Sequence, residues 1–113
     1  MHELGVTQNI LEIALRHAAG ANASRITELN LVIGQLASIV DDSVQFYWDI
    51  ISKDTIAEGA VIHFRRLPVE LLCLDCGTQY APSGDGFACP QCHGEKFKVV
   101  VGEEFYLDSI SVE

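Results

Sequence analysis

The chain has 113 residues, which is enough for one domain or for a small domain that carries a mini-domain. Its composition, 49% hydrophobic and 20% charged, is that of a globular protein, and it has no apolar run long enough to cross a membrane. The formal net charge is −9, and the basic residues group only at Arg65 with Arg66 and at Lys96 with Lys98. This balance argues against a protein that binds nucleic acid phosphates. The first residues lack the basic and apolar regions of a signal peptide, so we expect a cytoplasmic protein with reduced thiols.

The first third of the chain predicts a helix followed by a strand. Apolar residues recur at helical spacing over residues 3–19, which indicates an amphipathic helix. A run of β-branched and apolar residues over 26–36 predicts a strand. The predicted apolar stripe of the helix comprises Val6, Ile10, Leu11, Ile13, Leu15, His17 and Ala18.

A second helix and a second strand are predicted next. Asp41 and Asp42 are candidate N-caps, and Gln45 is placed as in a capping box, so we expect a helix over residues 41–58 that ends before Gly59. Residues 61–67 predict a strand. The order strand, helix, strand favours a crossover connection and is compatible with a parallel pair.

A last strand is predicted over residues 103–112, after a segment that contains all the cysteines. Its alternation slips between Leu107 and Ile110, as a β-bulge or burial on both faces would cause. We therefore predict an α+β fold, with a small three-stranded sheet and two helices formed by residues 1–69 and 101–113. Residues 70–100 are predicted to form an inserted, zinc-ribbon-like mini-domain.

The four cysteines form two C-x-x-C pairs, Cys73 with Cys76 and Cys89 with Cys92, and twelve residues separate the pairs. This spacing matches a four-thiolate zinc site. About thirty residues cannot bury much of a core, so we expect the metal to make the insert fold.

Other roles for the cysteines remain open. Two disulfides would need an oxidising compartment, and a redox C-x-x-C usually occurs singly. The second pair, followed by His93, also matches the attachment motif of a c-type haem, but that role would leave Cys73 and Cys76 unexplained. A rubredoxin-like iron site normally has a longer gap between its pairs. His93 is an alternative metal ligand, although four cysteines already complete a tetrahedron.

The N-terminus offers a second set of metal ligands. His2 is too large for the usual removal of Met1, so a free amine, an imidazole and backbone amides come together. Nitrogen ligands of this kind suit Ni(II) or Cu(II), and Glu3 could add a carboxylate. On these residues alone, however, a histidine at the second position is usually a frayed terminus without a role. His17 and His63 are better explained as structural residues, and no catalytic motif is present in the sequence.

Taken together, the sequence resembles the HypA/HybF family of hydrogenase maturation factors, which insert nickel. The resemblance covers nearly the whole chain. It rests on the Met1-His2-Glu3 start, both cysteine pairs, residues 33–36, 55–60 and 102–105, and the ending at residues 109–113.

The resemblance implies specific roles for these residues. His2 would be a nickel ligand with the Met1 amine and Glu3 close by, and the four cysteines would hold a structural zinc. Family members deliver nickel to the large subunit of [NiFe] hydrogenase with the GTPase HypB, and some also serve urease. We therefore expect a nickel metallochaperone, which is not an enzyme. The alternative is a zinc-ribbon adaptor or nucleic-acid-binding module without a transferable metal.

Overall fold

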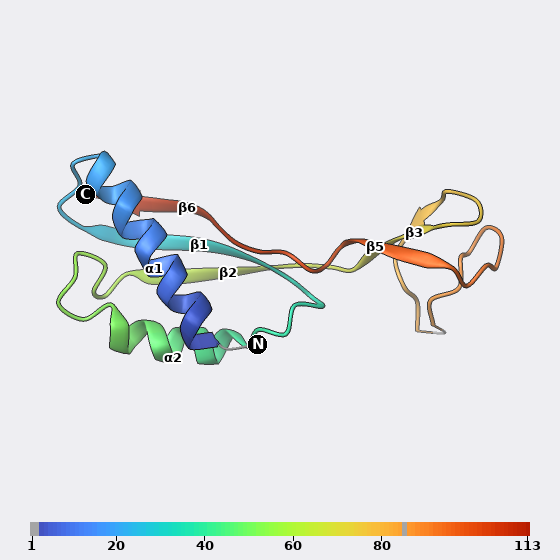
Figure 1. Cartoon of the computed structure of the whole chain (residues 1–113), viewed down its shortest axis with the longest axis horizontal. Coiled ribbons are helices and arrows are strands. Elements are labelled where there is room, and N and C mark those ends of the chain that lie inside the picture. The colour runs from blue at the N-terminus through green and yellow to red at the C-terminus, as the bar shows by residue number, and fades with distance from the viewer. Residues whose placement is uncertain (1–2, 85) are drawn as a thin grey trace. The chain divides into compact units, whose positions relative to one another are not determined.

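The computed structural model describes residues 3–84 and 86–113, which form two compact units (Figure 1). Among the described residues, one unit comprises 3–32, 38–65 and 106–113, and the other comprises 33–37, 66–84 and 86–105. No helix in the described residues has the length and apolarity needed to cross a membrane. The elements are α1 (Glu3–Gly20), β1 (Ile26–Gly34), α2 (Asp41–Ile51), β2 (Val61–Leu67), β3 (Glu70–Cys73), β4 (Gln79–Tyr80), β5 (Phe97–Val101) and β6 (Phe105–Val112).

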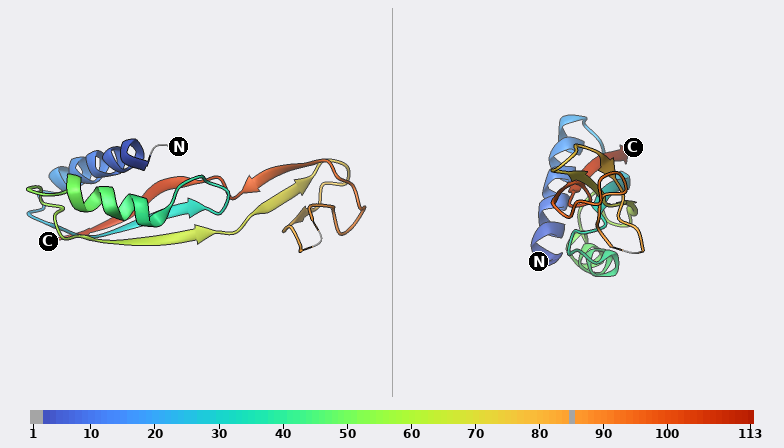
Figure 2. Two further views of the ribbon diagram at one scale, coloured as in Figure 1. Left: turned by 90° about the horizontal axis from the view of Figure 1, so that it is seen from below. Right: turned by 90° about the vertical axis from the view of Figure 1, so that its right-hand side faces the viewer.

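The first sheet has the strand order β2-β1-β6, with β1 in the centre. Near the start of β1, the Ile26 N–H donates to the Ile56 carbonyl (2.8 Å), and beyond its end the Gln35 N–H donates to the Leu67 carbonyl (2.9 Å). From the first contact to the second, the residue number rises on both sides, so the two segments run in the same direction. β1 and β2 are therefore parallel, as their arrows show in Figure 2. The helix α2 makes the crossover between them, as the sequence predicted.

The strand β6 runs antiparallel to β1 on the other side. The Glu113 N–H donates to the Arg25 carbonyl (2.8 Å), and the Gly34 N–H donates to the Glu104 carbonyl (2.6 Å). β6 begins at Phe105 rather than at residue 103 and contains no fully buried residue. Burial on both faces is therefore not the reason why its sequence alternation slips.

Both helices cover the same face of this sheet and pack against each other (Figure 2). The buried face of α1 differs from the prediction, because Ile13 is only half-buried and His17 is exposed. Ile10, Leu11 and Ala18 are buried as predicted, and the small Ala14 joins them, because small side chains allow a close approach between packed elements. The buried face comprises Thr7, Ile10, Leu11, Ala14 and Ala18.

The helix α2 is shorter than predicted. It ends at Ile51, and residues 52–59 form turns, which contradicts the expected helix to residue 58. Hydroxyl groups explain the early end, because the Thr55 side chain donates to the Ser52 carbonyl (2.6 Å) and accepts from the Ala57 N–H (3.1 Å). The predicted capping box is also wrong, since the N-cap is Val40 and makes no side-chain cap.

The second unit contains the sheet β4-β3-β5, with β3 antiparallel to both neighbours. Leu71 of β3 lies opposite Tyr80 of β4 and Val99 of β5. A small core forms from Val69, Leu71, Cys73, Tyr80 and Cys89, with Val99 packed against it.

Two glycines let backbones approach closely in this unit. A Cβ at Gly34 would overlap the carbonyl group of Gly102 and the amide nitrogen of Glu103. Gly102 itself has a φ of 131°, a conformation that other residues rarely adopt. Any larger side chain at position 34 must therefore displace the neighbouring backbone.

The fold is thus mixed α+β, with two helices, small sheets and a cysteine-bearing segment that resembles a zinc ribbon, as the sequence predicted. The predicted domain limits at residues 69/70 and 100/101 stay a prediction.

Candidate metal centre

The first cysteine pair lies on a tight turn that follows β3. Cys73 ends the strand, and its carbonyl accepts from the Gly77 N–H (3.0 Å). The Cys73 N–H donates to the Thr78 carbonyl (2.8 Å) and closes the turn. Gly77 has a φ of 79°, so the sequence places glycine where the left-handed conformation is required.

The second pair repeats this turn with a different residue at the strained position. The Cys89 carbonyl accepts from the His93 N–H (2.9 Å), and the Cys89 N–H donates to the Gly94 carbonyl (2.9 Å). His93 has a φ of 61° and therefore takes the place that Gly77 has in the first turn. This conformation costs a residue other than glycine about 1 kcal/mol.

The two turns bring the four sulfurs together. All four Sγ atoms lie within 4.8 Å of one another, with Cys73 and Cys92 3.5 Å apart and Cys76 and Cys89 3.6 Å apart. Zinc–sulfur bonds of about 2.3 Å in a tetrahedron place the sulfurs about 3.8 Å apart. The cluster therefore has the dimensions of a four-thiolate metal site. It is the one convergence of three or more metal-ligating side chains among residues 3–84 and 86–113.

One side of the cluster faces the small core and the other faces solvent. Cys73 and Cys89 are buried, whereas Cys76 and Cys92 are exposed. A metal held there would join β3 to the second turn from within the core. This position is suited to a structural role, because four sulfurs leave no open coordination position.

Hydrogen bonds and burial set the thiol pKa values apart. The Thr78 hydroxyl, 3.2 Å from the Cys76 Sγ, and the Thr78 amide lower the pKa of Cys76 to about 6. The Gly94 amide lowers the pKa of Cys92, but the neighbouring Cys73 thiol and burial outweigh it and raise that pKa to about 12. The lowered pKa favours the thiolate form of Cys76, whereas the raised pKa favours the protonated form of Cys92. A divalent cation must displace the Cys92 proton, so binding depends on pH.

Thr78 and Tyr80 are site residues that the sequence analysis missed. Burial raises the pKa of Tyr80, and the nearby cysteines raise it further, while its hydroxyl donates to the Phe87 carbonyl. The available signal for Thr78 was its position two residues after a cysteine in a C-x-x-C-G turn, where its amide and hydroxyl can both reach the sulfur.

The predicted N-terminal site lies mostly outside the described residues, which exclude Met1 and His2. Glu3 begins α1 and is half-buried, and its carbonyl accepts a hydrogen bond from the buried Thr7 hydroxyl. The structure therefore fixes the helix turn that follows the predicted nickel ligands.

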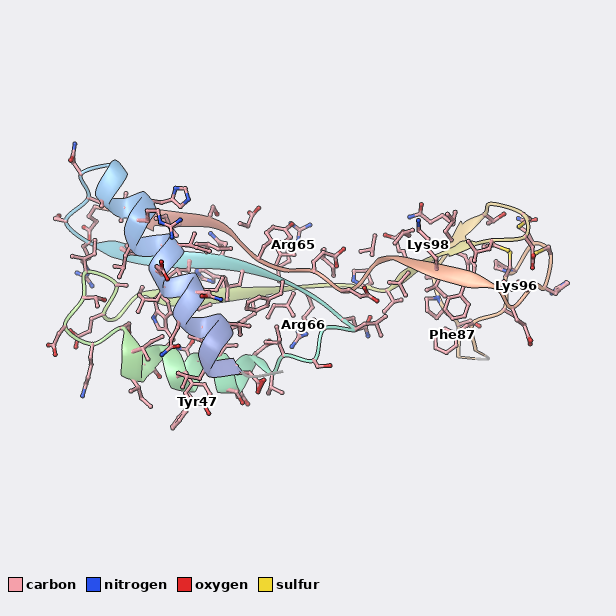
Figure 3. The ribbon with its side chains drawn as sticks, viewed as in Figure 1. Tyr47, Arg65, Arg66, Phe87, Lys96 and Lys98 are labelled. Carbon is pink, nitrogen blue, oxygen red and sulfur yellow. The ribbon has the colours of Figure 1, made fainter. Side chains whose placement is uncertain are left out.

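The other histidines do not join a metal-ligating group within the described part of the chain. His17 is exposed and lines a cavity of about 220 Å³ with Ile13 and residues 107–110. The His63 Nε2 lies 3.0 Å from the Glu28 Oε1 on the neighbouring strand. Figure 3 shows Arg65 and Arg66 at the end of β2, and Lys96 and Lys98 at β5.

Comparison with known proteins extends these observations to the whole chain. The sequence model of the HypA family, described as "Hydrogenase/urease nickel incorporation, metallochaperone", matches residues 1–112. The chain is 41% identical over 113 residues to a hydrogenase maturation factor HypA of Dehalococcoides mccartyi, covering all of this chain and 95% of that protein. It is 34% identical to the hydrogenase maturation factor HybF of Escherichia coli O157:H7, covering both chains completely.

Solved structures agree with the fold. The solution structure of the Ni metallochaperone HypA from Helicobacter pylori matches 99% of this chain and 97% of that chain, with a TM-score of 0.72. A second HypA solution structure matches 100% of this chain and 97% of that one, with a TM-score of 0.80. Both are 23% identical in sequence, so they bear on the fold alone. The family match and the relatives together show that this chain belongs to the HypA family of hydrogenase maturation factors.

Proposed function

We propose that this chain is a nickel metallochaperone that binds Ni(II) at its N-terminus and delivers it to the large subunit of [NiFe] hydrogenase. The observation that carries the proposal is the match over residues 1–112 to a family described by nickel incorporation. His2 supplies the imidazole, and the Met1 amine and Glu3 supply further donors. Nitrogen donors of this kind suit square-planar or tetragonal Ni(II).

The four cysteines, in this proposal, hold a structural Zn(II). The fit of their sulfur separations to a zinc tetrahedron supports the assignment. A zinc bound by four thiolates has no position for a substrate or for an activated water, so the chain acts as a carrier and not as an enzyme. The proposed zinc domain comprises residues 70–100, and the proposed nickel domain comprises residues 1–69 and 101–113.

A carrier has to select its ion and then release it. A ligand set at a chain terminus is reachable by a partner protein, which favours transfer. The imidazole and the amine bind nickel only after they lose their protons, so nickel affinity should fall as the pH drops through about 6–7. Nickel is therefore held more weakly in acid, while the zinc thiolates keep the second unit folded.

The proposed partners are those that nickel delivery requires. They are the GTPase HypB, the hydrogenase large subunit and, as a further recipient, urease maturation proteins, all met in the cytoplasm. Membership of a maturation factor family supports this setting. A first test of these proposed partners is whether the purified GTPase and this chain form a complex in size-exclusion chromatography.

Calorimetry with NiCl₂ tests the nickel site directly. His2→Ala should abolish nickel binding while the zinc content, measured by mass spectrometry, stays the same. His17→Ala is the matched control, because His17 is an exposed histidine of α1 that the proposed site does not include. Nickel affinity retained in His2→Ala would disprove the site.

The rival proposal is a zinc-ribbon adaptor or nucleic-acid module without a transferable metal. It predicts no nickel binding and a salt-sensitive association with DNA or RNA. The net charge of −9 disfavours it. Fluorescence anisotropy of labelled oligonucleotides at increasing salt would separate the two proposals.

A further inference from the structure

The helix α2 turns two large apolar side chains toward solvent. Phe46 is 59% exposed and Ile50 is 55% exposed, and the two lie four residues apart, one turn of the helix. Asp42 and Asp49 are exposed beside them. We call these four residues the outer face of α2. The solvent side of an amphipathic helix is normally polar, so this apolar pair lacks an explanation from folding.

Packing inside the fold does not account for the pair. The opposite side of α2 carries Val44 and Trp48, which are almost completely buried, so the helix already has its core face. The half-buried Tyr47 extends the apolar area, because its ring meets that of Phe46 edge to face with centroids 5.4 Å apart. Figure 3 shows Tyr47 on the side of α2 that is turned away from β2.

Charge indicates what can cover this surface. Residues 40–54 contain four aspartates and one lysine, a net charge of −3, and α2 itself contains no basic residue. An anionic membrane or a nucleic acid backbone would be repelled. A protein segment whose apolar side chains are flanked by Lys or Arg has the complementary charge.

We propose that the outer face of α2 docks a basic amphipathic segment of a partner protein. Phe46 and Ile50 are the apolar anchors, and Asp42 and Asp49 pair with the cations of the segment. Aromatic anchors at the centre of a surface, surrounded by charged groups, are typical of residues that carry most of the binding energy. The proposal goes beyond nickel binding, because none of these residues belongs to either proposed metal site.

A designed peptide pair tests this chemistry without knowledge of the natural partner. One peptide is an amphipathic helix of leucine and lysine, about 18 residues or five turns long, and the other has glutamate in place of lysine. The full-length protein should bind the lysine peptide at physiological salt in calorimetry and should not bind the glutamate peptide. Phe46→Ser should weaken the binding at least about tenfold, a loss typical of an interface anchor.

Matched variants distinguish binding at the outer face of α2 from a nonspecific attraction between the basic peptide and the acidic protein. Phe87→Ser removes an equally exposed phenylalanine, 54% exposed, and should leave the affinity unchanged. Asp49→Asn should weaken binding and reduce its salt dependence. The proposal is overturned if the lysine peptide does not bind, if Phe46→Ser binds it as tightly as the parent chain does, or if both peptides bind equally. Conversion of a dimer to a monomer by Phe46→Ser in sedimentation would also overturn it, because the occupant would then be a second copy.

Discussion

Removing the proposed zinc from the four-cysteine cluster should unfold the second unit and leave the first one intact. Apart from two cysteines, the buried apolar residues of the second unit are Ile33, Val69, Leu71 and Tyr80. At about 1.5–3 kcal/mol each, their burial contributes about 6–12 kcal/mol. A structural zinc contributes about 10–16 kcal/mol in small zinc domains. The metal thus supplies about 45–73% of the stabilisation in this comparison, so we expect the unit to lose its order without it.

The first unit provides an internal reference for the same experiment. It contains most of the buried apolar side chains, including Trp48, which is 1% exposed and is the only tryptophan of the chain. After treatment with a chelator under reducing conditions, the emission of Trp48 should not change. Backbone amides of β3 and β5 should lose their protection from hydrogen exchange, whereas those of β1 and α1 should keep it.

Added zinc should restore the exchange protection of β3 and β5. Protection of β3 that persists after the zinc content has fallen to zero would refute the reasoning, since the four apolar side chains would then suffice. A simultaneous red shift of Trp48 emission would refute it differently, by showing that the two units unfold as one.

Two further outcomes follow from the geometry. In the metal-free protein at pH 7, iodoacetamide should alkylate Cys76 and Cys92 at similar rates, because unfolding of the second unit removes the contacts that set their pKa values apart. Gly34→Ala should destabilise the protein by about 1–3 kcal/mol in urea unfolding, because the added methyl group meets backbone. Gly5→Ala, in open space on α1, should be neutral or stabilising by up to about 1 kcal/mol, and equal effects of the two alanines would contradict the packing argument.

The elements with clear local signals were predictable from the sequence. The strand β2 was predicted at its observed bounds, because Pro68 closes the segment directly after Leu67. The end of α2 was not predictable from periodicity, because hydroxyl hydrogen bonds of Thr55 to the backbone compete with the helix. The buried face of α1 was predicted only in part: Ile10, Leu11 and Ala18 are buried as predicted, whereas Ala14 was missed. Hydrophobicity ranks Ile13 above Ala14, whereas close packing favours the smaller residue.

The cysteine cluster was predictable because two C-x-x-C pairs at this spacing are typical of a tetrahedral zinc site. Its hydrogen bonds were not, since the contact of Thr78 with Cys76 and the backbone conformation of His93 appear only in three dimensions. The assignment of nickel to His2 came from family resemblance, which no argument from spacing could replace. It stays a prediction, because His2 lies outside the described residues.

The pairing of β6 with β1 has a consequence for folding kinetics. The Thr27 hydroxyl donates to the Ser111 carbonyl, 84 residues away in sequence, so the first sheet closes only after a distant segment arrives. About 37 residues separate β2 from β6, but the pairing of Glu70 with Val101 brings the ends of that connection together. When the second unit is folded, this pairing makes the connection between β2 and β6 behave as a loop about five times shorter. The entropic cost of closing that loop falls by about 1.4 kcal/mol. We therefore expect zinc to speed the refolding of the sheet about tenfold, even though no strand of that sheet touches the metal in the proposed site.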